Sequence, residues 1–492
     1  MTRFRIAIVS ALVSVSTFSV MLVQARDPID LGSRREIFID RHLIDQIDGA
    51  ELRLCHPRLE GMAIPFDEPW EGVFCGYPTV IQDSEGNGDR YLLYYRGSPK
   101  AGRDGTPTES VCYAESSDGI HWKKPKLGLF EVQGTRDNNV VLANAAPVMH
   151  NFTPFIDTRP GVPKSERFKA LGGTARSGMI GYQSADGIHW MRIREEPIYK
   201  KGVFDSQNIA FWSESEQRYV LYFRIWSEGG FTKYKGLRAI ARATSKDFLH
   251  WDEPQKMVYD EPQTEQFYTN GTQPYFRAPH IYTSMAKRFF PDKVSIDPEL
   301  AKKLVENPGY RRDTADAIFM TSRGGNRYDR TFREGFIRPG ADPQDWISRA
   351  NAPACGVVPA TDGRRMFIYR LSHYGQKSAH LARYSLRLDG FASLSAGFSG
   401  GELVTKPLRF SGKSLSINFA TSAAGGVCVE IQDASGKPFD GYALSDCAEA
   451  VGDQIERSVL WKGGYDVSRL AGKTVRLRFV LRDADLYSFR FQ

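Results

Sequence analysis

The stretch Ser117-Asp118-Gly119-Ile120-His121-Trp122 returns along the chain as Ala185-Asp186-Gly187-Ile188-His189-Trp190 and then, less strictly, as Lys246-Asp247-Phe248-Leu249-His250-Trp251. Successive tryptophans of these copies are separated by 68 and 61 residues. Repeats with a steady period indicate one supersecondary unit that is copied and stacked. The alternative is three unrelated hairpins that share a turn.

Each copy closes a pair of short apolar stretches. Residues 91–96 read Tyr-Leu-Leu-Tyr-Tyr-Arg and residues 111–115 read Val-Cys-Tyr-Ala-Glu before the first copy. Aromatic and β-branched residues between Gly- and Asp-containing turns are typical of strands. Three or four strands per repeat is the size of a β-propeller blade. Asp-Gly then supplies a tight turn with positive φ, and we expect the Trp to pack between neighbouring blades.

The repeat extends to five units, which predicts an all-β, five-bladed propeller over residues 36–390. The units begin near Tyr77, His150, Phe204, Tyr275 and Gly356. Unit four carries an inserted helix at 299–305. Unit five is one strand short, and residues 36–39 or 52–54 could supply that strand, which would remove exposed sheet edges.

The character of the chain changes near Gly401. Alternating strands joined by Gly-rich turns, without the repeated hexapeptide, predict a β-sandwich over residues 401–492. We expect it to support the propeller, and a carbohydrate-binding module is the alternative. Six cysteines lack metal-ligand spacing, and Cys428 and Cys447 are the pair best placed for a disulfide, the alternative being buried thiols.

The first 25 residues resemble a secretory signal. Arg3 and Arg5 precede an apolar run, and a small-residue cleavage site ends at Ala25. A membrane anchor is the alternative, but four serines make the run weakly apolar. We therefore predict an exported protein with no membrane association after cleavage. The net charge of +7 is mild and no basic patch suggests a nucleic-acid partner.

The turn motif Ser-x-Asp-x-x-His-Trp resembles one that recurs in five-bladed propeller glycosidases of families 32, 43, 62 and 68. Residues 277–282, Arg-Ala-Pro-His-Ile-Tyr, are similar to the Glu-Ala-Pro-His-Ile-Tyr stretch that opens a family 43 blade. A propeller followed by a β-sandwich is similar to the layout of family 32. The resemblance implies a divergent glycoside hydrolase fold, and it does not transfer a substrate, because Arg277 stands where family 43 has its acid and the family 32 signatures are absent.

Glycoside hydrolysis needs two carboxylates that flank the scissile bond. In a propeller, the starts of inner and third strands converge on the axial funnel, and this geometry selects five candidates. Asp205 opens the inner strand of unit three, Glu71 precedes that of unit one, and Glu109 and Asp316 begin third strands. Asp157 fits less well, in a turn at the far end. Each acid could instead cap a turn or pair with an Arg.

Several polar residues at strand starts are candidates for substrate binding. They are Arg277, His280, Asn151, Asn208, Asn270, Gln273, Arg349 and Asn351, with Trp70 and Tyr77 as stacking rings. Arg277 could hold a uronate, a sulfate or sugar hydroxyls, or it could form a salt bridge. The three histidines of the repeat are expected to be structural. No metal site or cofactor is predicted from the residues. Relatives often carry an axial calcium ion, but no Asp-rich loop here requires one.

These observations predict a secreted glycoside hydrolase that acts on poly- or oligosaccharide, of exo type, with a carboxylate pair in the funnel. The alternative is a non-catalytic glycan-binding propeller, because the family acid is replaced by Arg277. A lyase or a protein-interaction platform is a third reading. The sugar, the linkage and retention or inversion do not follow from the sequence.

Overall fold

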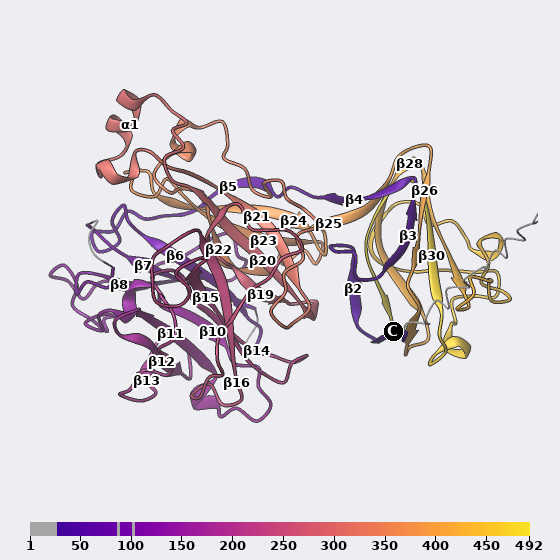
Figure 1. The fold of residues 1–492 in the computed structure, drawn as a ribbon, viewed down its shortest axis with the longest axis horizontal. Coiled ribbons are helices and arrows are strands. Elements are labelled where there is room, and N and C mark those ends of the chain that lie inside the picture. Colours follow the sequence, from indigo (N-terminus) through magenta and orange to yellow (C-terminus); the bar gives the residue numbers. More distant parts are fainter. Residues whose placement is uncertain (1–26, 86–88, 101–103) are drawn as a thin grey trace, which may run out of the picture.

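The computed structural model describes residues 27–85, 89–100 and 104–492, and their secondary structure is almost entirely β. Figure 1 shows two lobes: one holds the strands from β6 to β24 with helix α1 (Pro298–Leu304) at its edge, and the other holds β26, β28 and β30. The predicted signal segment lies outside the described residues. Within them, no helix is long and apolar enough to cross a membrane.

The larger lobe contains five groups of four strands. The first is β6 (Gly76–Asp83), β7 (Arg90–Gly97), β8 (Ser110–Ser116) and β9 (Val140–Leu142). The second is β10 (Thr153–Ile156), β11 (Phe168–Thr174), β12 (Gly178–Ser184) and β13 (Met191–Arg192). The third is β14 (Ile209–Ser213), β15 (Arg218–Trp226), β16 (Arg238–Ser245) and β17 (Gln255–Lys256).

The fourth group is β18 (Gln266–Thr269), β19 (Thr272–Tyr275), β20 (Ala278–Phe290) and β21 (Thr314–Ser322). The fifth is β22 (Ala352–Pro359), β23 (Arg365–Ser372), β24 (His380–Arg387) and β5 (Arg58–Pro65). A single parallel pair, Cys355 with Thr79, joins the fifth group to the first. One strand from each group contributes to a single hollow, through Val80, Phe155, Phe211, Gln273 and Val357.

The strand that completes the fifth group is β5, not residues 36–39 or 52–54, so that prediction is wrong. Residues 58–65 run antiparallel to β24. Instead, β2 (Arg35–Ile37) pairs with β30 (Arg476–Phe491), and β4 (Ala50–Leu54) pairs with β25 (Ala392–Ala396). Burial explains why β2 does not take the edge position. Ile37 of β2 is 1 % exposed in the core, whereas β5 lies at the edge of its sheet and exposes Leu59 and Met62.

The second lobe therefore combines both ends of the described chain. Its large sheet contains β28 (Leu415–Gln432), β29 (Asp453–Ser458), β30, β25 and β4, with β26 (Gly401–Thr405), β3 (Ile44–Asp48) and β2 attached. A two-stranded sheet pairs β1 (Ile29–Gly32) with β27 (Leu408–Phe410). Residues 29–54 thus pair with the C-terminal strands, whereas the sequence predicted a propeller from residue 36 and a sandwich that begins only at residue 401. All six cysteines are free thiols, so the predicted bridge between Cys428 and Cys447 is not formed.

The repeated hexapeptide forms the same turn in each copy. In the first, Asp118 Oδ1 accepts hydrogen bonds from the backbone of Ile120 and His121 at 2.8 Å, and its other oxygen lies 2.7 Å from His121 Nδ1. Asp186 and Asp247 repeat these contacts. The histidines are therefore structural, as predicted, and they are exposed.

The turns also connect neighbouring sheets, which explains why the third copy differs. Tyr94 of the first sheet donates a hydrogen bond to Gly187 O at 2.9 Å, and a Cβ on Gly187 would lie 2.4 Å from the Tyr94 hydroxyl. Only glycine fits there, since its φ is also +79°. In the third copy Phe248 takes the glycine's place at φ +70° and packs in a cluster with Leu171 of the preceding sheet.

Candidate functional site: a basic recess

Several inner strands begin at one end of the larger lobe with an unusual backbone. Tyr77, Phe204, Arg349 and Asn351 have φ between +51° and +64° beside the starts of β6, β14 and β22. Non-glycine residues in this left-handed region carry strain, and such strain concentrates at functional sites. A recess opens at this end, and its charged and aromatic lining is Arg96, Lys287, Arg349, Tyr77, Tyr268 and Tyr374. We refer to it as the basic recess.

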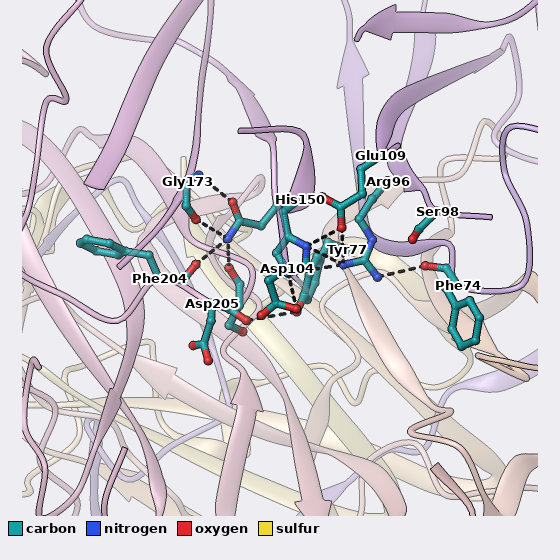
Figure 2. Close-up of polar contacts among 12 residues, drawn as sticks. Phe74, Tyr77, Arg96, Ser98, Asp104, Glu109, His150, Gly173, Phe204 and Asp205 are labelled. Carbon is teal, nitrogen blue, oxygen red and sulfur yellow. Dashed lines mark hydrogen bonds and ion pairs between the residues drawn. The ribbon is translucent and has the colours of Figure 1, made fainter. Parts of the chain in front are cut away.

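Arg96 leads to a buried network behind one wall of the recess. Figure 2 shows Arg96, His150 and Glu109 pointing toward one another. Glu109 Oε1 lies 2.8 Å from His150 Nδ1, and Arg96 Nη1 lies 3.1 Å from the same nitrogen. Asp104 Oδ1 lies 3.5 Å from the other ring nitrogen. Glu109 thus lies behind the lining of the recess, with a histidine as its first partner.

The second Glu109 oxygen is of interest because it has no hydrogen-bond partner among the described residues, although it is buried. A buried acceptor without a partner costs free energy, about 1–3 kcal/mol. The carboxylate therefore has one unused acceptor beside the recess.

Asp205 lies at the recess end of β14, in a half-buried position. Arg224 Nε donates to Asp205 Oδ1 at 2.9 Å, and Arg224 Nη2 donates to the Asp205 carbonyl at 2.9 Å. The Tyr77 hydroxyl donates to the same carbonyl at 3.4 Å. Figure 2 shows Asp205 on the side of the cluster where Asp104 lies. The position is that expected of a funnel residue, but the carboxylate is paired with an Arg.

Tyr268, on β18, is surrounded by cations. Lys287 Nζ and the Arg224 guanidinium each lie 4.9 Å from the ring centroid, Arg238 lies 5.3 Å away and Arg349 lies 6.0 Å away. These groups come from β15, β16, β20 and the segment before β22. A tyrosine ring partly offsets the mutual repulsion of such cations through its negative face.

Asp313, immediately before β21, is the carboxylate on this side. Its Oδ1 accepts from the Arg349 backbone at 2.7 Å, and its Oδ2 lies 3.3 Å from Arg349 Nε. Burial raises the pKa of Asp313 above its ordinary value, and Arg349 and Lys287 oppose that rise. Burial lowers the pKa of Lys287 to about 7, although the charge of Asp313 works in the other direction.

Two predicted catalytic acids, Glu71 and Asp316, do not line the recess. Glu71 is fully buried, 2.7 Å from Lys124 Nζ and hydrogen-bonded to Tyr95, because it fills the polar interior beneath the first sheet. Asp316 is held by Arg288, whose Nε lies 2.8 Å from Oδ1. Burial raises the pKa of Glu71. Asp157, the weaker candidate, is buried between Lys169 and Tyr219, 2.6 Å from each.

The predicted asparagines are fixed in the backbone framework. Asn151 donates to the carbonyls of Gly173, Phe204 and Ser206, Asn208 donates to those of Phe204 and Ser206, and Asn351 donates to those of Ala315 and Asp345. All three are fully buried. They hold the strained strand starts in place and are not part of the lining of the recess. Asn270 and Trp70 are likewise buried and bonded to protein groups.

Arg277, His280 and Gln273 also lie away from the basic recess, because a two-residue turn at 276–277 reverses the chain between β19 and β20. Arg277 therefore sits at the opposite end, 3.0 Å from Asp389 and 2.7 Å from Glu456 of the smaller lobe. His280 lies 2.9 Å from Glu36. Gln273 lines the far hollow, with Nε2 2.8 Å from Cys355 Sγ. Of the predicted binders, only Arg349 and Tyr77 line the recess.

The groups that the sequence reasoning missed share one signal. Arg96, Arg224 and Lys287 each follow an uninterrupted apolar or small-residue run on the second long strand of their sheets, and Arg370 does the same in the fifth. A basic residue at one end of repeated apolar strands indicates a charged end to the fold. Among the described residues, no cluster of three or more His, Cys, Asp or Glu side chains could hold a metal ion.

No model of a known protein family and no curated protein matches this chain. Solved structures similar to it include one described as a glycoside hydrolase, at 14 % identity and TM-score 0.45, covering 68 % of this chain and 92 % of that one. Another is an N-acetylgalactosamine deacetylase from F. plautii in complex with blood group B trisaccharide, at 13 % identity and TM-score 0.44. That match covers 69 % of this chain and 96 % of the other. A third is a family 43 arabinoxylan arabinofuranohydrolase from Bacillus subtilis in complex with cellotetraose, at 12 % identity and TM-score 0.39. That match covers 86 % of this chain and 96 % of the other. These similarities transfer no residue's role to this chain.

Proposed function

We propose that this protein is an exported glycoside hydrolase that acts on poly- or oligosaccharides, with its active site at the basic recess. In this proposal the five strand groups are blades of one propeller, closed by β5, and the smaller lobe is a supporting β-sandwich. The observation that carries the proposal is the recess itself: tyrosine rings suit the faces of sugars, and Asp205, Glu109 and Asp313 stand directly behind its charged lining.

An exo mode of action is supported by what borders the recess. Tyr310 lies in the insertion that includes α1, and the Arg349 guanidinium lies 4.2 Å from the Tyr310 ring. Tyr310 also packs edge-on against Phe74 at 5.9 Å. A recess walled by an insertion accommodates the end of a glycan chain more readily than its middle.

Two carboxylates are assigned roles. Asp205, ion-paired with Arg224, is the base or nucleophile. Asp313 is the proton donor, because burial raises its pKa and a donor must hold its proton until the leaving oxygen takes it. Glu109, with one unpaired oxygen, is the second candidate for the donor. Export rests on the signal-like residues 1–25.

The test is a screen of the purified protein against a panel of polysaccharides, with product sizes followed over time. An exo enzyme releases one small product from the first time points. Asp205→Asn and Asp313→Asn should each lower turnover by about two to four orders of magnitude. Asp252→Asn, at an exposed position outside the recess, is the control. Full activity of both recess variants would refute the assignment.

A non-catalytic glycan-binding protein is the second candidate. The observation in its favour is that no carboxylate lines the recess among the described residues, and that Asp205 and Asp313 are both paired with Arg. In that case the wild-type protein would bind oligosaccharides from the panel and release no product from any of them.

A further inference from the structure

The lining of the basic recess is unbalanced in charge. It includes Arg96, Lys287 and Arg349, and no acidic residue of the described chain lines it. Arg349 has a partner in Asp313, at 3.3 Å. Arg96 is 4.0 Å from Glu109, whose nearer oxygen also lies against His150. Lys287 has no carboxylate within ion-pair distance among the described residues.

Lys287 is the most unusual of the three. It is 3 % exposed, and its one hydrogen-bond acceptor among the described residues is the Arg349 backbone carbonyl. An ammonium group has three donors, so two of them lack a protein acceptor. A buried charge without a counter-ion is costly, and proteins seldom retain one without a reason. Its pKa, lowered to about 7, reflects that cost.

The neighbours of Lys287 add to the imbalance. Arg238 shares the Tyr268 ring with it and hydrogen-bonds to Gln266, with no carboxylate partner among the described residues. Burial and the adjacent Arg224 lower the pKa of Arg238 to about 10. Asp205 and Asp313 therefore neutralise only part of the positive charge around Tyr268. A bound anion would neutralise more of it.

We propose that the recess recognises an acidic sugar, and that the carboxylate or sulfate ester of that sugar lies against Lys287 and Arg349. The planar Arg349 guanidinium presents paired donors that suit either oxyanion, while the Lys287 ammonium supplies a compact charge with free donors. The glycan part of this inference rests on the proposed function. The anionic part rests on Lys287 and Arg238, which have no carboxylate partner among the described residues.

Binding measured by calorimetry tests the inference without requiring turnover. The probes are trigalacturonate, a sulfated galactotriose and neutral galactotriose, which are similar in length and differ in the charged group. We expect at least one acidic probe to bind at least about tenfold more tightly than the neutral one. The uronate and sulfate arms show which oxyanion the recess takes. Equal affinity for all three, or no binding of either acidic probe, overturns the inference.

Lys287→Met is the decisive variant, with Lys256→Met as a matched control, because Lys256 is an exposed lysine on β17. Lys287→Met should abolish the preference for acidic probes, while Lys256→Met should change the binding of neither the acidic nor the neutral probes. Thermal stability separates this role from a structural one. Removal of an unpaired buried charge should keep or raise the melting temperature, whereas loss of a structural ion pair would lower it. If Lys287→Met does not fold, Lys287→Gln serves the same purpose.

The outcomes also separate this inference from the proposed function. Preferential binding of an acidic probe with no hydrolysis of any glycan would remove the hydrolase and keep the anion site. Hydrolysis of a neutral glycan, with no preference for acidic probes, would do the reverse.

Discussion

The far hollow and the basic recess of the larger lobe differ in chemistry. The far hollow is lined by side chains of the inner strands themselves and is largely apolar, with Val80, Phe155, Phe211 and Val357 around Gln273. The basic recess takes its charges from other elements, namely Arg96 from β7, Lys287 from β20 and Arg349 from the segment before β22. The charges of the recess thus come from β7, β20 and the segment before β22, and not from β6, β10 or β14.

This difference separates packing from function. Aromatic contacts at the far hollow are between apolar rings, as in the edge-on pair of Phe211 and Tyr282 at 5.1 Å. Those at the recess are between rings and cations, as in Tyr268 with Lys287 at 4.9 Å. Substitutions at the two ends should therefore have different consequences, and the following experiments measure them.

The largest effect is expected for matched aspartates, each of which is paired with an Arg. Asp205 pairs with Arg224 beside the recess, whereas Asp316 pairs with Arg288 away from it. Asp205→Asn should lower turnover on a confirmed substrate by about two to four orders of magnitude, because the amide cannot take a proton. Asp316→Asn should keep turnover within a few-fold of the wild-type rate. Steady-state kinetics of both variants provide the measurement. A larger loss of turnover in Asp316→Asn than in Asp205→Asn would refute the assignment of Asp205 as the base or nucleophile.

The next effect concerns the ring at the centre of the cations. Tyr268→Leu should lower the free energy of unfolding by about 2 kcal/mol, because four cations lose the ring that offsets their repulsion. High salt should restore part of that loss, since it screens the repulsion. Urea unfolding at low and high salt measures both quantities.

Two variants calibrate that measurement. Tyr268→Phe keeps the ring and should remain close to the wild type. Phe211→Leu, at the far hollow, should cost no more than about 1.5 kcal/mol and show little dependence on salt. A salt-independent loss in Tyr268→Leu would mean that the ring matters only for packing.

The sequence predicted the periodic part of the fold because local chemistry sets it. The Asp-Gly-x-His-Trp turn is stabilised by its own Asp and Ser, so Asp118 and Asp186 make the same contacts in different sheets. The closing strand was misplaced because β2 and β5 are similar apolar segments locally. Their partners, β30 and β24, are chosen by packing between distant parts of the chain.

The candidate site was predicted less well, for a related reason. A position at a strand start predicts access to the recess, but Asn151 and Asn208 use that position to bond to strained backbone. Arg277 was assigned to the wrong end because the turn at 276–277 was not recognised. Lys287 lies inside a long strand, and nothing in its neighbours along the chain shows that it faces Tyr268.

A smaller effect is expected on the pH dependence of acidic-sugar binding. The anion should bind better when Lys287 is protonated, so affinity should fall as the pH rises through about 7, by about tenfold between pH 6 and pH 8. Arg238 and Arg349 remain charged over this range, whereas Asp313, with its raised pKa, also faces the lysine. Calorimetric titrations of Lys287→Met over the same pH range separate the contribution of the lysine from that of Asp313. The affinity of that variant should not change with pH if Asp313 contributes little.

The lowered pKa of Lys287 also makes the free energy of unfolding depend on pH. The folded-state pKa of Lys287 lies below its ordinary value, so the cost of burying its charge is fully present below pH 7. That cost should be relieved as the pH rises from about 7 toward the ordinary value near 10.4. The difference in unfolding free energy between wild type and Lys287→Met should therefore narrow with rising pH. A difference that stays constant over this range would mean that the pKa of Lys287 is the same in the folded and the unfolded state.

The smallest effect is expected at the far hollow. Gln273 lines it and contacts Cys355, a fully buried thiol, and neither residue reaches the recess. Gln273→Leu has a similar volume and removes one hydrogen bond, so we expect binding of the acidic probes to change by less than about twofold and stability by about 1 kcal/mol. Calorimetry with the same three oligosaccharides provides the measurement. If Gln273→Leu weakened binding as much as Lys287→Met does, the sugar would extend through the channel or occupy the far hollow, and the division between a packing end and a binding end would fail.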